Sequence, residues 1–287
     1  MSRAPIAILC AIEDELVHLR ANLPPPYDDW HADRRARLTT LDGQPIVLAR
    51  CGIGMASAAA ATEAIIQRYR PAAIINYGCA GAHRPDLLPG DLVIGARVVA
   101  QDRVMLEADG AERYLGMWYQ RADEPTKTPV LPGAPALLAL ATQTAEELEG
   151  QHEPWPSAAG WPVSVPHRSP RLTIGTVATS DRWTRAQDRI AQIVAVHDSA
   201  CEEMEAAAIA LTCAGHGVPF LAVKDISNNE LLRTTGDGWS AETEGQLGRR
   251  AAALVLVMLR RIAAAPNLLE VVAEAGRATD ETPNDGG

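Results

Sequence analysis

Short apolar runs alternate along the chain with segments of helical periodicity. Ile6–Ala11 is a continuous apolar run, which is typical of a strand buried on both faces of a sheet. Leucines at helical spacing follow it, and Pro24-Pro25-Pro26 ends that helix. Similar apolar runs predict strands over residues 73–77, 92–100, 172–178 and 219–226. Periodic segments predict helices over residues 56–70, 135–148, 186–194, 206–215 and 243–264.

One hairpin interrupts this alternation near the amino end. Arg37–Leu41 and Ile46–Cys51 flank the dipeptide Asp42-Gly43, which is typical of a tight hairpin turn. Strands that alternate with helices favour parallel pairing, whereas a hairpin pairs antiparallel. We therefore expect an α/β fold with a mixed sheet between helices, formed by a single domain over residues 1–276.

Two segments fall outside this pattern. Residues 150–170 are rich in proline and contain Trp155 and Trp161, so a loop is expected there. That loop serves either as a lid or as part of an interface, and the sequence does not decide between the two. Residues 277–287 are polar without periodicity and are expected to be a disordered tail.

Composition and charge exclude several classes of function. No apolar run reaches 18 residues, so no membrane span is expected. The net charge of −10 argues against nucleic-acid binding, which requires a basic surface. The five cysteines form no CxxC pair and the histidines form no HExxH motif, so neither a metal nor a cofactor is expected. Cysteines in apolar segments suit a reducing compartment, and we expect a cytoplasmic protein.

Polar or small residues follow several of the predicted strands. Ligands of α/β sheets bind at the carboxyl ends of strands, so these segments are candidates for a site. They are Glu13-Asp14-Glu15, Gly78-Cys79-Ala80-Gly81, residues 179–183 and Ser227-Asn228, together with Glu203-Met204-Glu205 at the start of a helix.

Each candidate also has a purely structural interpretation. Acidic residues in a first helical turn stabilise the helix dipole, and glycine, serine and asparagine favour turns. In the functional interpretation, a carboxylate after the first strand activates water as a general base. Glu205 accepts both hydroxyls of a ribose, since a carboxylate has two oxygens. Trp183 either covers the edge of the core or stacks on a purine.

Taken together and in this order, seven segments resemble the 5′-methylthioadenosine/S-adenosylhomocysteine nucleosidases of the nucleoside phosphorylase superfamily. The resemblance implies a three-layer αβα sandwich around a central mixed sheet and a homodimer or larger homo-oligomer. It also implies hydrolysis of the N-glycosidic bond of a small-molecule purine nucleoside with a modified 5′ end. The segments are AILCAIEDEL (7–16), CGIG (51–54), PAAIINYGCAGA (71–82), LLPGDLVIG (87–95), TSDRW (179–183), EMEAAAIA (203–210) and VPFLAVKDISN (218–228).

The resemblance also implies roles for single residues around the sugar. Glu15 corresponds to the carboxylate that activates the hydrolytic water. Glu203, Met204 and Glu205 correspond to the ribose-binding segment, in which Glu205 accepts the diol. Cys79 stands where the family often has serine near the water, with Gly81 close by.

The purine side of the site carries the remaining implied contacts. Trp183 stands where an aromatic residue stacks on the base, and main-chain groups of Thr184 are expected to meet the base edge. Ser227 precedes the residue that contacts N7. Away from the base, Lys224 replaces an arginine in the neighbourhood of Cys79 and the hydrolytic water.

The chain departs from the family at Asn228. The family has an aspartic acid there, which donates a proton to N7 of the leaving adenine, and an amide does not act as an acid. Three outcomes remain open: a preference for a 6-oxopurine, as in futalosine hydrolases; protonation by water, Asp225 or Glu230; or a weak or repurposed homologue. The last includes a non-catalytic nucleoside-binding protein.

The charge of the candidate segments favours hydrolysis over phosphorolysis. Phosphate requires cations or a dense group of N–H donors. The segment Ile12-Glu13-Asp14-Glu15 is acidic, and Asn76-Tyr77 precedes the glycine turn without an arginine. Arg182 and Arg185 remain possible anion contacts, so a purine nucleoside phosphorylase is kept as the alternative.

Overall fold

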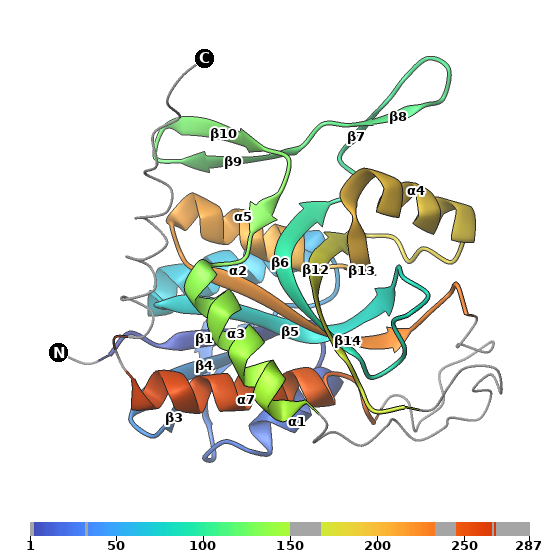
Figure 1. The fold of residues 1–287 in the computed structure, drawn as a ribbon. Coiled ribbons are helices and arrows are strands. Elements are labelled where there is room, and N and C mark those ends of the chain that lie inside the picture. Colours follow the sequence, from blue (N-terminus) through green and yellow to red (C-terminus); the bar gives the residue numbers. More distant parts are fainter. Residues whose placement is uncertain (1–2, 32–33, 150–167, 233–244, 266, 268–287) are drawn as a thin grey trace, which may run out of the picture.

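The fold is a central sheet covered by helices on both faces (Figure 1). The computed structural model describes residues 3–31, 34–149, 168–232, 245–265 and 267. The sheet has the order β11-β6-β12-β13-β5-β1-β4-β3-β2, with β14 paired to both β5 and β6. Its strands are β1 (Ile6–Cys10), β2 (Tyr27–His31), β3 (Arg34–Leu41), β4 (Gln44–Arg50), β5 (Ala73–Ala82), β6 (Leu92–Ala100), β11 (Leu131–Pro132), β12 (Leu172–Thr179), β13 (Ser199–Glu203) and β14 (Phe220–Asn228).

Two apolar cores lie on opposite faces of the sheet. Side chains of β1 alternate between them: Ala7 and Leu9 pack in one core, whereas Ile6 and Ile8 pack in the other. This double burial explains the continuous apolar run. Helices α2 (Met55–Tyr69) and α5 (Ala206–His216) cover the first face, and α1 (Glu13–Arg20), α3 (Pro135–Leu148) and α7 (Arg249–Ala264) cover the second. The predicted three-layer α/β sandwich with a mixed sheet is confirmed.

Five strands of the sheet close into a ring. β14 pairs parallel with β5 and antiparallel with β6, while β12 pairs parallel with both β6 and β13. β13 returns to β5 through the pairs Cys201–Ala82 and Glu202–Gly81. The carboxyl ends of β5, β13 and β14 therefore meet at one place.

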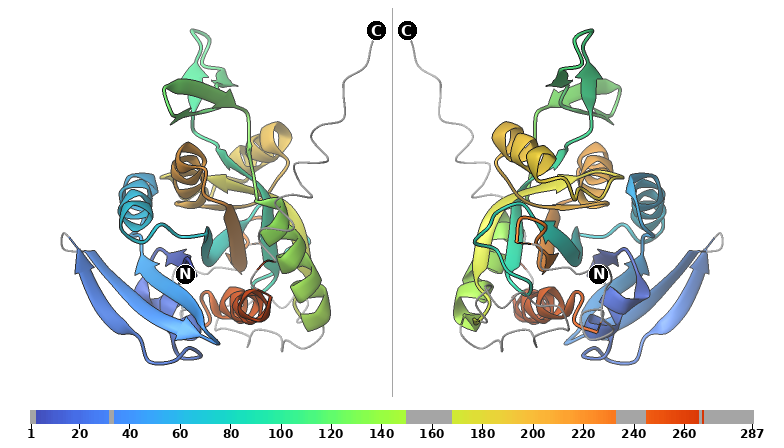
Figure 2. Two further views of the ribbon diagram at one scale, coloured as in Figure 1. Left: turned by 90° about the vertical axis from the view of Figure 1, so that its left-hand side faces the viewer. Right: turned by 90° about the vertical axis from the view of Figure 1, so that its right-hand side faces the viewer.

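Two small hairpins extend from the body of the molecule (Figure 2). The first joins β7 (Val104–Leu106) to β8 (Glu112–Tyr114), and the second joins β9 (Met117–Arg121) to β10 (Glu124–Thr128). Each of these strands has only three to five residues, too few to show a clear periodic pattern, so the hydrophobic pattern did not predict them. Helix α4 (Gln187–His197) lies beside β13 and was predicted.

The predicted hairpin around Asp42-Gly43 is confirmed. β3 and β4 pair antiparallel, and both turn residues have a positive φ, 49° and 82°. Two positive φ values suit the right-handed twist of hairpin strands.

Several predicted boundaries were wrong. Gly78–Gly81 continues β5, and Ser227-Asn228 continues β14, so neither is a turn. The strand β13 was missed, and Glu203 ends it rather than opening a helix. Helix α5 ends at His216, with Gly217 rather than Gly215 as the glycine that caps it, and α7 begins only at Arg249. The loop expected over 150–170 falls outside the described residues up to 167, and the tail 277–287 lies wholly outside them.

Candidate active site

A cavity of about 370 Å³ opens where the carboxyl ends of β5, β13 and β14 meet. A volume of this size suits a small-molecule ligand. Most of the predicted site residues line it: Glu15, Cys79, Gly81, Trp183, Glu203, Met204, Glu205, Ser227 and Asn228. The remaining lining residues include Glu202 and Leu247, which lie outside every candidate segment; the full set is Ala11, Ile12, Asp14, Ile53, Ala80, Arg182, Glu202 and Leu247.

Main-chain N–H groups from the segment after β1 and from β5 hold the carboxylate of Glu15. Its Oε2 accepts from Ala11 N at 3.0 Å and Ile12 N at 3.4 Å, and its Oε1 accepts from Cys79 N at 2.9 Å. Only 4% of the residue is exposed. The first acids of α1 therefore divide by role: Glu15 turns into the cavity, whereas Glu13 binds Arg20 and Arg37.

The lack of a side chain at Gly78 allows this placement. A Cβ atom built on Gly78 would lie 2.5 Å from Glu15 Oε1, which is too close for any real contact. Tyr77 stabilises the start of α1, because its hydroxyl donates to the main-chain oxygen of Glu15 at 2.8 Å. The glycine in β5 thus leaves the space that a carboxylate occupies.

Glu205 reaches the cavity from the start of α5. Its Oε1 accepts from Gly54 N at 2.9 Å, and Gly54 has a φ of 91°, which glycine adopts without strain. The turn Gly52-Ile53-Gly54 therefore faces the same pocket as Glu205. Burial, and next the carboxylate of Glu203, raise the pKa of Glu205 from 4.5 to about 7.

Glu203 and Lys224 form a buried ion pair behind the cavity wall. Lys224 Nζ lies 2.9 Å from Glu203 Oε2, and the two side chains are almost fully buried. Glu203 also accepts from Ala206 N at the start of α5 and from the hydroxyl of Thr179. Burial alone would lower the pKa of Lys224, but the carboxylates of Glu203, Glu205 and Glu15 outweigh it and raise that pKa. Lys224 does not itself line the cavity, but its positive charge partly balances the negative charge of these carboxylates.

We expect kcat/KM to fall as the pH drops below about 7. The resemblance assigns the ribose diol to Glu205, and a protonated carboxyl group has less acceptor capacity for two hydroxyls than a carboxylate. The pH dependence of kcat/KM reports the ionisation of the free enzyme. A Glu205→Gln variant should show lower kcat/KM without this acidic limb. Measurement of kcat/KM against pH for both proteins tests this expectation. If kcat/KM of the variant still declines at low pH as in the wild type, the ionisation belongs to another group.

The ionisation of Glu205 also makes the free energy of unfolding depend on pH. The pKa of Glu205 in the folded state, about 7, lies above its ordinary value of 4.5. The folded state therefore binds more protons between these two values, and this contribution to stability is lost as the pH rises through 7.

Apolar side chains complete the cavity. Ile53, Met204 and Leu247 line it together with Trp183, whose side chain is 52% exposed. An indole at the mouth of a cavity offers a flat face to a planar ligand. The placement of Trp183 is compatible with the stacking that the resemblance implied.

Asn228 lies in a short polar chain at the end of β14. Its Oδ1 accepts from the hydroxyl of Ser227 at 2.8 Å, and its Nδ2 donates to Glu230 Oε1 at 3.2 Å. The hydroxyl of Ser227 also lies 3.1 Å from the main-chain oxygen of Ala80. These contacts fix the orientation of the amide.

Thr184 does not line the cavity. Its main-chain N–H, which the resemblance assigned to the base edge, donates to Glu202 Oε1 at 2.6 Å. Glu202 itself lines the cavity and is 7% exposed. No sequence signal indicated Glu202, because β13 contains no long apolar run and its register on β5 is a feature of the tertiary structure.

Cys79 lies beside Glu15 in the cavity wall. Burial, and next the carboxylate of Glu15, raise the pKa of its thiol well above the ordinary value. The thiol therefore stays protonated at neutral pH and is a weak donor rather than a nucleophile.

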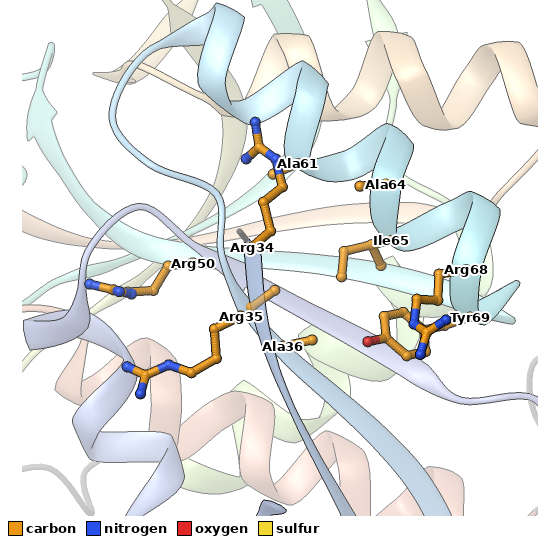
Figure 3. A pocket seen from close by; sticks show the side chains of 10 residues that line it. Arg34, Arg35, Ala36, Arg50, Ala61, Ala64, Ile65, Arg68 and Tyr69 are labelled. Atoms are coloured by element: carbon orange, nitrogen blue, oxygen red, sulfur yellow. The ribbon is translucent and has the colours of Figure 1, made fainter. Parts of the chain in front are cut away.

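A second hollow lies between β3 and α2 and shares no lining residue with the cavity (Figure 3). Arginines surround it, but Arg35 lies 3.6 Å from Asp28, and Arg68 lies 3.0 Å from Asp29. Its volume of about 20 Å³ holds roughly one water molecule. This hollow is too small for a nucleoside.

Two searches of the structure concern other classes of site. In the described part of the chain, no three histidine, cysteine, aspartate or glutamate residues are grouped as metal ligands would be. Over the same residues, no helix is both long and apolar enough to cross a membrane.

Comparison with known proteins places this geometry in a family context. The model of the phosphorylase superfamily matches residues 5–264. A 5′-methylthioadenosine/S-adenosylhomocysteine nucleosidase of Geobacillus thermodenitrificans is 32% identical over 226 residues, which cover 77% of this chain and 83% of that protein. The nucleosidase of the same name from Tolumonas auensis is 28% identical over 260 residues, covering 90% and 99% of the two chains.

A solved structure agrees with this sequence similarity. The S-adenosylhomocysteine nucleosidase of Streptococcus pyogenes, crystallised with 5-methylthiotubericidin, superposes with a TM-score of 0.72 at 25% identity. The match covers 91% of this chain and 98% of that one. The similarity therefore extends over both the sheet and the helices that build the cavity.

Proposed function

This chain belongs to the phosphorylase superfamily, in which its relatives are named nucleosidases, and we propose that it hydrolyses the N-glycosidic bond of a 5′-modified purine nucleoside. One observation carries the proposal: Glu15 and Glu205, which are far apart in the sequence, line the same cavity. 5′-Methylthioadenosine and S-adenosylhomocysteine exemplify the substrate class.

The two carboxylates have different roles: Glu205 binds the sugar, and Glu15 activates the water. Glu205 accepts hydrogen bonds from the ribose diol, which places C1′ towards Glu15. The C1′–N9 bond breaks with its electron pair leaving on the base, and a water oxygen bonds to C1′. Glu15 accepts a proton from that water, and the leaving base gains one from solvent. The products are a free purine and a 5-modified ribose.

The charge of the cavity supports water over phosphate as the nucleophile. Asp14, Glu15 and Glu205 line it together with Glu202 and Glu203. Among the lining residues that the structure describes, the one cation is Arg182, which is exposed. A phosphate dianion next to Glu15 would experience like-charge repulsion, whereas neutral water would not.

We expect release of free base at the same rate with and without phosphate. Chromatography of a reaction with 5′-methylthioadenosine should show the base and the free modified ribose in both conditions. A sugar 1-phosphate that forms only in phosphate buffer would show the alternative, a purine nucleoside phosphorylase. Ligand-induced thermal stabilisation without any released base would show a non-catalytic binding protein.

We further propose that the protein acts in the cytoplasm as a homodimer or larger homo-oligomer. The free cysteines Cys10, Cys51, Cys201 and Cys213 are buried, as expected in a reducing compartment. Exposed apolar side chains at the cavity, Ile53 and Trp183, support an interface near its mouth.

A further inference from the structure

Glu202, Gly81 and Asn228 form one row across three strands. Gly81 of β5 pairs with Glu202 of β13 on one side and with Asn228 of β14 on the other. Directly paired residues point to the same face of a sheet. A Cβ built on Gly81 would lie 3.3 Å from Asn228 Nδ2, so the lack of a side chain at Gly81 leaves room for the amide beside it on that face.

This row has the dimensions of a site for a planar base. Neighbouring strands lie about 4.8 Å apart, so the Cα atoms of the two outer residues are separated by roughly 10 Å. Gly81 adds no side chain between them. The floor is therefore flat, with a carboxylate at one edge and an amide at the other, and both edges line the cavity.

The amide edge donates hydrogen bonds but supplies no acidic proton. Asn228 Oδ1 is engaged by the hydroxyl of Ser227, which directs the NH₂ group of the amide away from Ser227. One N–H points to Glu230 Oε1, and a carboxamide nitrogen carries two hydrogens. The second is available to an acceptor such as N7 of a purine.

The carboxylate edge only accepts. Burial raises the pKa of Glu202, but His83 and the N–H of Thr184 more than offset it, so this pKa lies below the ordinary value and the group is ionised. Glu202 Oε2 lies 3.1 Å from Gln101 Nε2 and 3.3 Å from His83 Nε2. The hydrogen bonds from Gln101 to Oε2 and from the main-chain N–H of Thr184 to Oε1 hold the carboxylate in place.

These two edges discriminate between purines. Adenine has a lone pair at N1, which an ionised carboxylate repels, and the N–H of Thr184 that would meet it is already bound to Glu202. A 6-oxopurine has a hydrogen at N1, which a carboxylate accepts. Its C6 carbonyl also delocalises the negative charge of the departing base, so a hydrogen bond at N7 is sufficient and no acid is needed there.

We propose that Glu202 selects a 6-oxopurine base by accepting its N1–H, while Asn228 donates to N7 at the opposite edge. This inference rests on the proposed hydrolysis of 5′-modified purine nucleosides and specifies their base. It assigns a specificity role to a residue of β13 that lies on the other side of Gly81 from Asn228.

The test compares one pair of substrates, 5′-methylthioadenosine and its 6-oxo counterpart, in the wild type and in a Glu202→Gln variant. We expect the wild type to prefer the 6-oxo substrate in kcat/KM. The variant should lower kcat/KM for that substrate by about 10- to 100-fold, the size expected for a hydrogen bond to a charged group, with a much smaller change for the 6-amino substrate. An Asp14→Asn control removes the same formal charge from the exposed edge of the cavity, outside the row of Glu202, Gly81 and Asn228, and it should change both substrates by similar factors.

Binding of free bases to the wild type tests the inference without any variant. Calorimetry should show tighter binding of hypoxanthine than of adenine, and weaker binding of 1-methylhypoxanthine, which lacks the N1–H. A wild-type preference for the 6-amino substrate, an equal loss for both substrates in Glu202→Gln, or equal binding of hypoxanthine and its 1-methyl derivative would overturn it. Failure to hydrolyse either nucleoside would instead contradict the proposed function.

Discussion

Replacing Glu15 by glutamine should reduce hydrolysis by about 10²- to 10⁴-fold, the contribution typical of a general base. An amide does not accept the proton of the attacking water. It also keeps only one acceptor oxygen, whereas the carboxylate of Glu15 serves three main-chain N–H groups with two. Steady-state kinetics with the preferred substrate measure the loss, which should appear mainly in kcat.

The neighbouring Asp14 provides a matched control. It belongs to the same helical turn and is exposed at the edge of the cavity. Asp14→Asn removes the same formal charge, so a purely electrostatic effect of net charge would reduce both variants alike. We expect Asp14→Asn to lose less than about tenfold, because exposed charges are screened by solvent. A fully active Glu15→Gln protein would eliminate the mechanism.

Replacing Asn228 by aspartic acid should raise kcat/KM for the 6-amino substrate, by up to about 10²-fold, which is the lower range for a general acid. The new carboxylate would lie near Glu230, whose Oε1 is 3.2 Å from the amide nitrogen that it replaces. Two carboxylates at this separation do not both ionise readily, so one retains a proton near neutral pH. That proton becomes available to N7 of adenine.

The pH profile distinguishes this explanation from a change in binding. A gained acid should introduce a new decline of kcat/KM at high pH for the 6-amino substrate. The 6-oxo substrate, whose departure depends less on protonation, should gain little. Adding Glu230→Gln to the Asn228→Asp variant should shift the decline to lower pH, because the repelling charge is removed. An Asn228→Asp protein with unchanged rates on both substrates would show that N7 protonation does not limit the reaction.

Much of the fold followed from local patterns. The apolar run of β1 predicted a strand buried on both faces, and both cores confirm it. Pro135 marked the start of α3, and the structure places the helix at the predicted residues. β13 was not predicted, because the residues from Ser199 to Glu203 neither alternate between apolar and polar nor form a long apolar run. The strand is nevertheless buried, because neighbouring strands cover it.

The sequence predicted the candidate site as a set of segments, and the structure shows which residue of each segment faces the cavity. Glu15 could not be distinguished from Glu13 and Asp14 by spacing, since all three lie in one helical turn. The space left by Gly78 and the N–H groups of Ala11 and Cys79 decide for Glu15. Lys224 and Thr184 were expected at the ligand, but they lie behind the cavity wall and bind Glu203 and Glu202.

The sequence alone determined the alternation of strands and helices, the hairpin at Asp42-Gly43 and the chemical groups available for a site. These properties are local, because periodicity and turn preferences are read from neighbouring residues. Only the tertiary structure decided that Glu15 and Glu205 share a cavity and that Glu202 and Asn228 flank Gly81. Such relations depend on the register between strands far apart in the chain, which the burial of the whole sheet fixes.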